Sequence, residues 1–256
     1  MKLISVLLAG AALFASAATA SAEVRFGIMN EAYPPFFAKD AAGTWHGWEI
    51  ELMNAVCAEM KESCSVVDVS WDGLIPALQT KKFDVIWSSM GITDERLKTI
   101  DFTVKYYNTP SKLIAAKDAA PGATPEAVDG KTIGIQVSTV QSDYYKKYFA
   151  DKASEQTYQT LDEAFQDLAA GRIDYVFGDA IPLAEFLKSD FGKECCSDAG
   201  NVADDPAVLG SGIGGGLRKG DTELKAKLDA AITAVRASGK YDEISKKYFD
   251  FDIYGK

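Results

Sequence analysis

The sequence predicts an α/β protein built from two similar lobes. Two observations lead to this prediction: apolar, strand-like segments alternate with helix-like segments along most of the chain, and one helix–turn–strand unit occurs twice. Such alternation is typical of mostly parallel sheets covered by helices. The length of 256 residues, of which 47% are hydrophobic, is enough for two lobes that each bury a core.

The first part of the chain supplies three strands and two helices in alternation. Helical spacing places four residues of the first helix on one face, namely Ile50, Met53, Asn54 and Cys57. Asp72 is a suitable N-cap for the second helix. The expected strands are Val24–Ile28, Cys64–Val69 and Phe83–Ser88, and the expected helices are Trp48–Met60 and Asp72–Thr80.

The same rhythm restarts after the turn signal Pro121-Gly122. Here the expected strands are Lys131–Gln136 and Ile173–Phe177, and the expected helices are Val140–Phe149 and Leu161–Ala169. The second half therefore repeats the organisation of the first.

One helix–turn–strand unit occurs twice in the sequence, and the two copies align without a gap. Residues 71–89 and 161–179 both read helix, basic turn, aspartate, apolar strand and polar tip, and Asp84 matches Asp174 at an offset of 90 positions. Chance resemblance between two generic units is the alternative explanation. A true repeat predicts two lobes of similar fold.

The polar strand ends predict a binding site. In open α/β sheets, ligands bind beyond the carboxyl ends of the strands. Ser88 and Ser89 follow the strand of the first copy, and Asp179 follows that of the second. Lobes that face each other would place hydroxyls and a carboxylate across one cleft. Hydroxyl and N–H groups suit a carboxylate and Asp179 suits an ammonium group, so we expect a small zwitterionic ligand.

Composition excludes several classes of function. The formal net charge is −10, from 27 Lys and Arg against 37 Asp and Glu, and no basic run offers a surface for phosphates. Nucleic acid binding is therefore not expected. His46 is the single histidine, which excludes a metal site built from several histidines. We expect no cofactor and no catalytic residue.

The amino terminus predicts export. Residues 1–22 combine the charged Lys2, a mostly apolar stretch and the small residues Ala20-Ser21-Ala22, as a secretory signal does. A membrane anchor is the alternative, but the apolar stretch is shorter than the ~20 residues that span a bilayer. We expect a secreted protein located in the periplasm.

Export permits disulfide bonds. Cys57 lies near the end of an expected helix and Cys64 at the start of a strand, so we expect a disulfide between them that contributes about 2–3 kcal/mol. Cys195 and Cys196 are adjacent, and a strained vicinal disulfide and two free thiols both remain open. The spacing of the four cysteines argues against a zinc site.

Nucleotide and hydrolase motifs fail their structural context. Residues 210–215 match G-x-G-x-x-G, but no strong strand precedes them and a turn follows. A strand packed so closely that only glycine fits is the better interpretation. A serine or cysteine hydrolase would need a histidine base, and His46 lies in a turn signal where an exposed side chain is expected.

Six motifs resemble periplasmic solute-binding proteins for polar amino acids, family 3, which serve ABC transporters. The chain resembles the histidine-binding and lysine/arginine/ornithine-binding proteins, over nearly all of residues 23–256. The motifs are Tyr33-Pro34-Pro35-Phe36, residues 47–52 (GWEIEL), residues 71–78 (WDGLIPAL), residues 88–96 (SSMGITDER), Gly171-Arg172-Ile173-Asp174 and residues 246–255 (KKYFDFDIYG).

This resemblance implies a Venus-flytrap fold with two lobes joined by two hinge strands. Lobe 1 would comprise residues 23–107 and 213–256, and lobe 2 residues 108–212. Ligand binding would close the hinge, and an inner-membrane ABC permease would recognise the closed form. A chemoreceptor is an alternative partner, and a monomer is expected.

The resemblance also implies roles for individual residues. Arg96 would clamp the carboxylate of the ligand, and Asp179 would hold the α-ammonium group. Ser88 and Ser89 would supply hydroxyl contacts, while Gly91 would contribute only its N–H group because relatives often have serine there.

Four further residues complete the implied site. Ser138 and Gln141 begin the first helix of lobe 2, whose N-terminus favours anions. Tyr33 and Trp71 would sandwich the ligand side chain, and core packing is the alternative for both.

The specificity of the site stays open at the sequence level. An acidic residue near the end of the first strand contacts the distal cation in relatives that bind basic amino acids. This sequence reads Met29-Asn30-Glu31-Ala32 there, with one residue more, so Glu31 would favour a basic ligand and Asn30 a neutral one. We expect a polar amino acid and favour a basic one. The alternatives are an opine receptor and a cyclohexadienyl dehydratase-like enzyme on the same fold.

Overall fold

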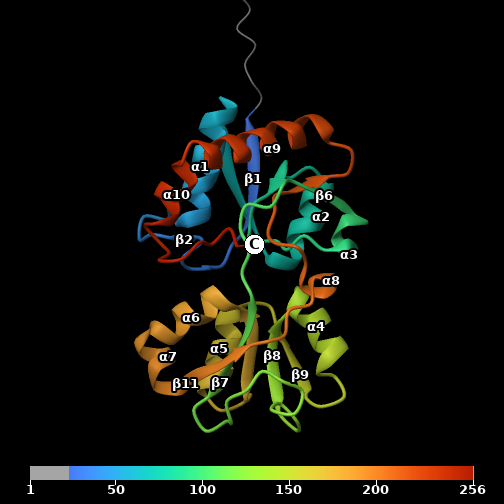
Figure 1. Ribbon diagram of the computed structural model, residues 1–256, viewed down its shortest axis with the longest axis vertical. Coiled ribbons are helices and arrows are strands. Elements are labelled where there is room, and N and C mark those ends of the chain that lie inside the picture. The colour runs from blue at the N-terminus through green and yellow to red at the C-terminus, as the bar shows by residue number, and fades with distance from the viewer. Residues whose placement is uncertain (1–22, 256) are drawn as a thin grey trace, which may run out of the picture.

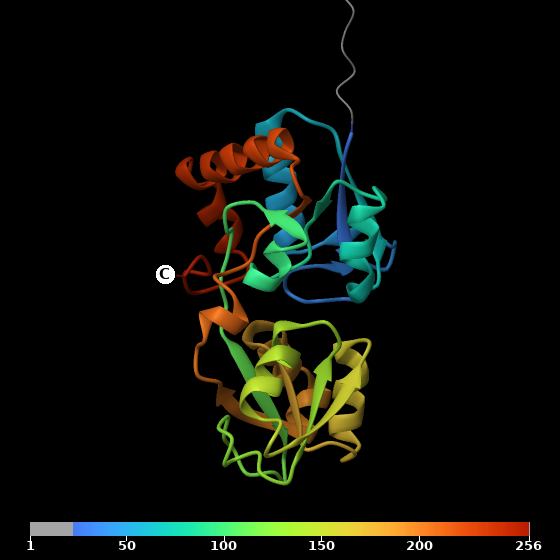
Figure 2. The same ribbon diagram turned by 90° about the vertical axis from the view of Figure 1, so that its right-hand side faces the viewer.

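A computed structural model describes residues 23–255 as a mixed α/β structure with two five-stranded sheets in separate lobes (Figure 1). The predicted signal peptide lies outside these residues. Two segments pass between the lobes, one after strand β6 (Ile100–Phe102) and one that contains helix α8 (Pro206–Leu209), as Figure 2 shows from the side. They pair where Tyr107 and Ile213 form an isolated bridge.

The first sheet has the order β4-β1-β5-β12-β6. Strands β4 and β5 run parallel to β1, and β12 runs antiparallel to β5 and β6. The strands are β1 Val24–Met29, β4 Cys64–Val69, β5 Val85–Ile86, β6 Ile100–Phe102 and β12 Gly216–Arg218. The helices of this lobe are α1 Trp48–Met60, α2 Leu74–Gln79, α3 Asp94–Leu97, α9 Thr222–Ala237 and α10 Lys240–Ser245, and β2 Ala38–Lys39 pairs with β3 Trp45–His46.

The second sheet has the order β11-β7-β10-β8-β9. Strands β9 and β10 run parallel to β8, and β7 runs antiparallel to β10 and β11. The strands are β7 Ser111–Ala116, β8 Thr132–Gln136, β9 Ser154–Tyr158, β10 Tyr175–Asp179 and β11 Cys196–Asn201. The helices are α4 Val140–Tyr148, α5 Leu161–Ala169, α6 Ala180–Lys188, α7 Asp190–Cys195 and α8 Pro206–Leu209.

The two sheets share one topology. In the first sheet β1 lies between its parallel neighbours β4 and β5, and in the second sheet β8 lies between β9 and β10. Beyond β5 come β12 and β6, which run antiparallel to each other, and beyond β10 come β7 and β11 with the same directions. The repeated aspartates have the same role: Asp84 accepts a hydrogen bond from the backbone N–H of Arg25 at 3.1 Å, and Asp174 accepts one from Thr132 at 2.9 Å. Each aspartate thus fixes the start of the neighbouring parallel strand.

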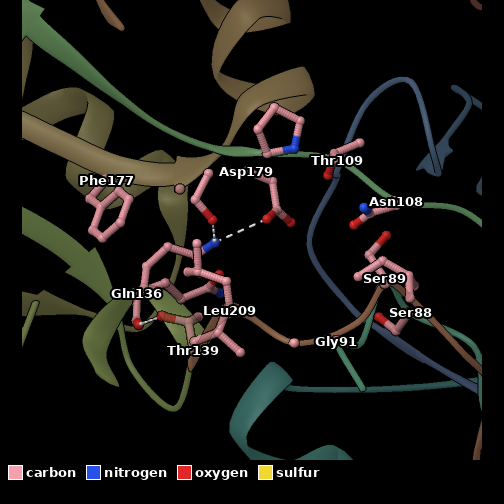
Figure 3. Close-up of a pocket in the computed structure, with 18 of the residues that line it drawn as sticks. Ser88, Ser89, Gly91, Asn108, Thr109, Gln136, Thr139, Phe177, Asp179 and Leu209 are labelled. Carbon is pink, nitrogen blue, oxygen red and sulfur yellow. Dashed lines mark hydrogen bonds between the residues drawn. The ribbon is translucent and has the colours of Figure 1, made fainter. Parts of the chain in front are cut away.

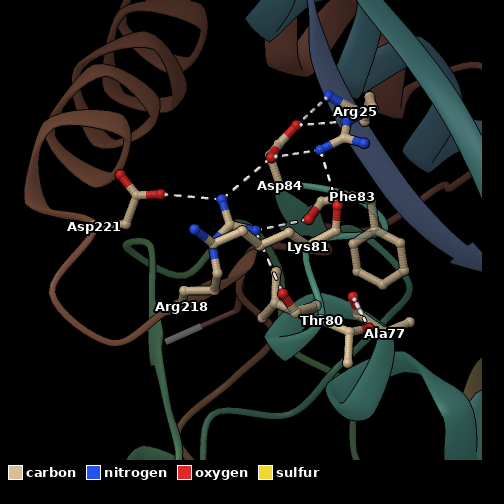
Figure 4. Close-up of polar contacts among 9 residues, drawn as sticks. Arg25, Ala77, Thr80, Lys81, Phe83, Asp84, Arg218 and Asp221 are labelled. Carbon is tan, nitrogen blue, oxygen red and sulfur yellow. Dashed lines mark hydrogen bonds and ion pairs between the residues drawn. The ribbon is translucent and has the colours of Figure 1, made fainter.

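Asp84 is also the centre of an ion-pair network at the edge of the sheet opposite to the strand tips (Figure 4). Its carboxylate accepts from Arg25 Nε at 3.0 Å and from Arg218 Nη2 at 3.1 Å, while Arg218 Nη1 donates to the Phe83 carbonyl at 2.7 Å. Burial opposes ionisation, but these hydrogen bonds hold the pKa of Asp84 below its ordinary value. The network ties β1, β5 and β12 together.

Several local predictions need correction. Asp72 is not a helix cap: residues 71–73 form a 3₁₀ turn before α2, and Ser70 Oγ donates to Asp72 at 2.6 Å. The strand expected to reach Ser88 ends at Ile86, because the Ser88 side chain takes the hydrogen bond of Met29 N–H. Asn54 is exposed rather than part of the buried face of α1.

The cysteines agree with the sequence, and the glycine-rich segment agrees only in its packing. Residues 210–215 are not the expected strand, because β12 starts at Gly216. Cys57 and Cys64 form the expected disulfide, and of the two possibilities left open for Cys195 and Cys196 the structure has the vicinal disulfide. Gly214 packs so closely that a Cβ atom would lie 2.9 Å from Ile92 Cδ1. No helix within residues 23–255 is long and apolar enough to cross a membrane.

Candidate ligand-binding site

A cavity of about 490 Å³ lies between the two lobes, lined by residues of both lobes and of the two connecting segments (Figure 3). The strand tips that carry the repeated polar residues reach this cavity. Ser88, Ser89 and Asn108 lie on one side of it, across from Gln136 and Thr139. The residues proposed from the sequence that line it are Tyr33, Trp71, Ser88, Ser89, Gly91, Arg96, Gln141 and Asp179.

Arg96 supplies the positive charge of the cavity. Thr93 caps α3 by accepting from the Arg96 N–H at 3.2 Å, which fixes the start of this short helix. The guanidinium donates to the carbonyl oxygens of Gly91 at 3.0 Å and Ser138 at 3.1 Å. Burial lowers the pKa of Arg96 to about 10, so the group remains a cation at neutral pH.

Asp179 supplies a negative charge from the other lobe. It is the last residue of β10 and the N-cap residue of α6, but its carboxylate does not cap the helix. Instead it accepts from the Tyr33 hydroxyl at 2.5 Å and from Gln141 Nε2 at 3.0 Å. Burial raises the pKa of Asp179, and these two hydrogen bonds oppose the rise.

Ser88 and Ser89 have opposite hydrogen-bond roles. Ser88 Oγ accepts from Met29 N–H at 2.9 Å, which leaves its own proton available to donate. Ser89 has a positive φ of 54°, and its Oγ donates to the carboxylate of Glu49 at 2.7 Å. The Ser89 oxygen therefore has only its lone pairs left, with which it can accept a hydrogen bond from another group.

Glu49 is a residue that sequence reasoning missed. Its carboxylate is fully buried in the first turn of α1 and accepts from the Ser89 N–H at 2.9 Å and from the Tyr106 hydroxyl. Burial raises the pKa of Glu49 to about 7, against the effect of these hydrogen bonds. The sequence signal that could have indicated its burial is its position between two apolar residues, Trp48 and Ile50, which are both buried.

The two aromatic candidates contact different polar groups of the cavity. Tyr33 is buried, and its hydroxyl links the lobes through Asp179. Trp71 is partly exposed, donates from Nε1 to the Ser138 carbonyl at 3.3 Å and has the Arg96 guanidinium 5.5 Å from the centre of its ring. This arrangement is a cation–π contact within the protein.

Ser138 and Glu31 do not line the cavity. Ser138 contributes its carbonyl oxygen to Arg96 and Trp71 and adopts a φ of 60°. Glu31 accepts a cross-lobe hydrogen bond from Gln136 Nε2 at 2.6 Å, and burial raises the pKa of Glu31 to about 7. Gln136 itself lines the cavity, whereas Asn30 is exposed.

The connecting segments form walls of the cavity that the sequence had not predicted to bind a ligand. Residues 108–111 and 209–213 line the cavity beside the paired polar groups. Within residues 23–255, no group of three His, Cys, Asp or Glu side chains is placed to hold a metal ion.

Residues 24–251 match the model of the bacterial extracellular solute-binding proteins, family 3. The chain belongs to this family. Among curated members, the L-arginine-binding protein of Pseudomonas aeruginosa is 43% identical over 91% of this chain and 90% of the relative. The lysine/arginine/ornithine-binding periplasmic protein of Escherichia coli is 40% identical over 97% of this chain and 96% of the relative.

Solved structures of similar proteins have the same fold. An ancestral arginine-binding protein bound to arginine aligns with a TM-score of 0.80 at 30% identity, over 89% of this chain and 98% of the other. An ancestral amino acid-binding protein described as a precursor of cyclohexadienyl dehydratase aligns with a TM-score of 0.77 at 29% identity, over 89% and 95%. The predicted fold class is therefore confirmed.

Proposed function

We propose that this chain is a periplasmic receptor that captures a basic amino acid between its lobes and delivers it to an ABC importer. One observation carries the proposal: a guanidinium from one lobe and a carboxylate from the other line the same cavity. Arg96 and Asp179 are complementary to the two charged groups that every free α-amino acid carries. The names of the family members described above support a basic ligand.

The proposal gives a role to the charged groups of the cavity and to their neighbours. Arg96 and the Gly91 N–H bind the α-carboxylate, together with the N-terminus of α4, where Thr139, Val140 and Gln141 line the cavity. Ser138, proposed from the sequence, would act only through its carbonyl, which holds Arg96. Asp179 binds the α-ammonium group, and its hydrogen bonds from Tyr33 and Gln141 hold the carboxylate in place.

The side chain of the ligand would lie between Tyr33 and Trp71, towards Gln136. Gln136 Nε2 donates to the Gln159 carbonyl as well as to Glu31, so the amide oxygen is the atom left to accept from the ligand. Glu31 adds negative charge behind Gln136 in its ionised form, which prevails above the raised pKa of about 7. This combination favours a distal group that is rich in N–H donors, such as a guanidinium.

The paired connecting segments support the lobe borders predicted from the sequence. We propose that residues 23–107 with 213–256 form lobe 1 and residues 108–212 form lobe 2, with the hinge where Tyr107 pairs with Ile213. Closure about this hinge would form the surface that an inner-membrane permease recognises. We expect a monomer in solution, and a chemoreceptor is a second possible partner.

A binding function accounts for the arrangement of the site without any catalysed reaction. Asp179 is committed to two hydrogen bonds and faces an arginine, an arrangement suited to holding a zwitterion. The resemblance to a precursor of cyclohexadienyl dehydratase makes enzymatic activity on this fold the alternative. Turnover of prephenate or arogenate would support that alternative and overturn the receptor.

A thermal-shift panel of the common amino acids and several opines tests the proposal. The protein is first unfolded and refolded to remove any ligand carried through purification. A ligand at 100 times its Kd stabilises by about 2.7 kcal/mol, a shift of roughly 5–10 °C for a chain of this size. We expect arginine or another basic amino acid to give this shift.

Matched variants then test the site. Arg96→Ala should abolish the shift, whereas Lys98→Ala, an exposed cation nearby that pairs with Glu95, should leave it unchanged. Full affinity in Arg96→Ala would overturn the carboxylate assignment. A shift with opines alone would replace the amino acid by an opine as the ligand.

A further inference from the structure

The buried carboxylate of Glu49 lies directly beneath the wall of the cavity. Its Oε1 accepts from the Ser89 N–H at 2.9 Å and from the Tyr106 hydroxyl, and its Oε2 accepts from Ser89 Oγ at 2.7 Å. Ser89 lines the cavity, whereas Glu49 does not. Glu49 can therefore act on a ligand only through its neighbours.

An ionised carboxylate can only accept hydrogen bonds. The single hydroxyl proton of Ser89 must then point at Glu49, so the Ser89 oxygen offers only lone pairs to any other group. The adjacent Ser88 is in the opposite state, since its oxygen accepts from Met29 N–H and its proton is left to donate. Two neighbouring hydroxyls thus present opposite polarity.

We propose that Glu49 is a positioning residue that fixes Ser89 Oγ as a hydrogen-bond acceptor for the α-ammonium group of the ligand, beside Asp179. This inference rests on the proposed function. An ammonium group has three N–H donors and needs more than one acceptor, which Asp179 alone does not supply in three directions. Glu49 also holds the Ser89 backbone, whose φ of 54° is uncommon for a residue with a side chain.

Protonation of Glu49 would reverse this polarity. A protonated carboxyl can donate to Ser89 Oγ, and the serine proton would then turn towards the ammonium site as a repulsive donor. Because burial raises the pKa of Glu49 to about 7, this reversal falls within an accessible pH range.

The other titratable groups around Glu49 are three tyrosines and one aspartate. Burial raises the pKa values of Tyr33, Tyr106 and Tyr107 well above the ordinary value, so these phenols stay neutral. Asp179 also has a raised pKa, and its protonation would weaken ammonium binding too. A variant in which residue 49 cannot titrate separates the pH dependence due to Glu49 from that due to Asp179.

Glu49→Gln is that variant. Its side-chain oxygen can still accept from Ser89 N–H and Tyr106, while its NH₂ group must donate to Ser89 Oγ. Titration calorimetry with arginine, or with whichever amino acid gives the thermal shift, measures Kd between about pH 5.5 and about pH 8.5. Glu51→Gln is the matched control, because Glu51 lies on the same helix and pairs with Lys247 at the surface.

The expected result has two parts. At about pH 8.5, Glu49→Gln should bind about tenfold more weakly than the wild type, and Glu51→Gln should match the wild type. The wild type should lose affinity as pH falls through about 7, and Glu49→Gln should lack this component. The 2-hydroxy analogue of the ligand carries a hydroxyl in place of the ammonium group, and a hydroxyl can accept as well as donate. The preference for the amino acid over this analogue should therefore be smaller in Glu49→Gln than in the wild type.

A second variant serves if Glu49→Gln does not fold. Ser89→Ala removes the hydroxyl whose polarity is at issue, and it should also lose the pH component near 7. An unchanged pH profile and unchanged ligand discrimination in either variant would overturn the inference, even if thermal stability falls. Failure of the wild type to bind any amino acid would instead refute the proposed function.

Discussion

Replacement of Asp179 by asparagine should separate ligand binding from stability. The side chain keeps its size, but the cavity loses its partner for the ammonium group. Breaking one side of a buried ionic pair costs about 2–5 kcal/mol. At about 1.4 kcal/mol per factor of ten, Kd should rise by roughly 30-fold to several thousand-fold.

The unligated protein should respond in the opposite direction. Burial raises the pKa of Asp179, so the folded state binds more protons than the unfolded state above the ordinary pKa of about 3.9. Stability then falls as pH rises through this window, because the ionised carboxylate disfavours the fold. The Asp179→Asn variant carries no such charge, so its Tm without ligand should be equal to or above that of the wild type near neutral pH.

Titration calorimetry and thermal denaturation of the same samples provide the test. Asp204→Asn is the control, because Asp204 is a second acidic residue that lines the cavity, at a position outside the Tyr33–Gln141 network. Its Kd should stay within about threefold of the wild type. The reasoning is refuted if both variants weaken binding equally, since the effect would then be one of overall charge and not of a specific pair.

Three further perturbations address stability. Tyr107→Phe should raise the free energy of unfolding by about 1 kcal/mol in urea titrations. The Tyr107 hydroxyl is buried and makes no hydrogen bond of good geometry within residues 23–255, although the Ser89 side chain lies near it. A loss of more than about 1 kcal/mol would contradict this. Asp84→Asn should lower stability by about 1–2 kcal/mol at neutral pH, because Arg25 and Arg218 hold the pKa of Asp84 low. The difference should begin to shrink as pH falls below about 4 and should be lost once pH falls through the lowered pKa of the folded state. A loss that persists in strong acid would refute the ionic explanation. Replacing Cys57 and Cys64 by serine should lower Tm by roughly 4–12 °C without changing Kd, and an unchanged Tm would show that the disulfide is dispensable.

Elements with strong local signals were predictable from the sequence. Helix α5 has the predicted bounds Leu161–Ala169, since Thr160 and Glu163 form a capping box at its start and apolar residues recur along one face. Helix α1 and strand β4 also have the predicted bounds. In these segments local propensity and tertiary packing favour the same structure.

The failures have a common physical reason. Strand β5 stops early because a side-chain hydroxyl replaces the backbone partner, and a 3₁₀ turn precedes α2 because Ser70 and Asp72 bond each other. Glu49 was missed because hydrophobic periodicity identifies only the apolar face of a helix. In the sequence, a buried glutamate cannot be told from a solvent-exposed one until its hydrogen-bond partners are known. Such polar contacts depend on residues that are distant in the sequence.

The internal repeat explains why the site needs both lobes. The repeated aspartates Asp84 and Asp174 fix equivalent strands, so the tips at Ser89 and Asp179 are equivalent places in the two sheets. The same scaffold therefore delivers lone pairs from one lobe and a full negative charge from the other, with Arg96 nearby. A ligand can shift the lobes towards closure only by the extra affinity that it gains in the closed state. Under the proposed function, only a molecule with a carboxylate and an ammonium group on one carbon gains from both lobes at once, so closure itself selects α-amino acids before any side chain is read.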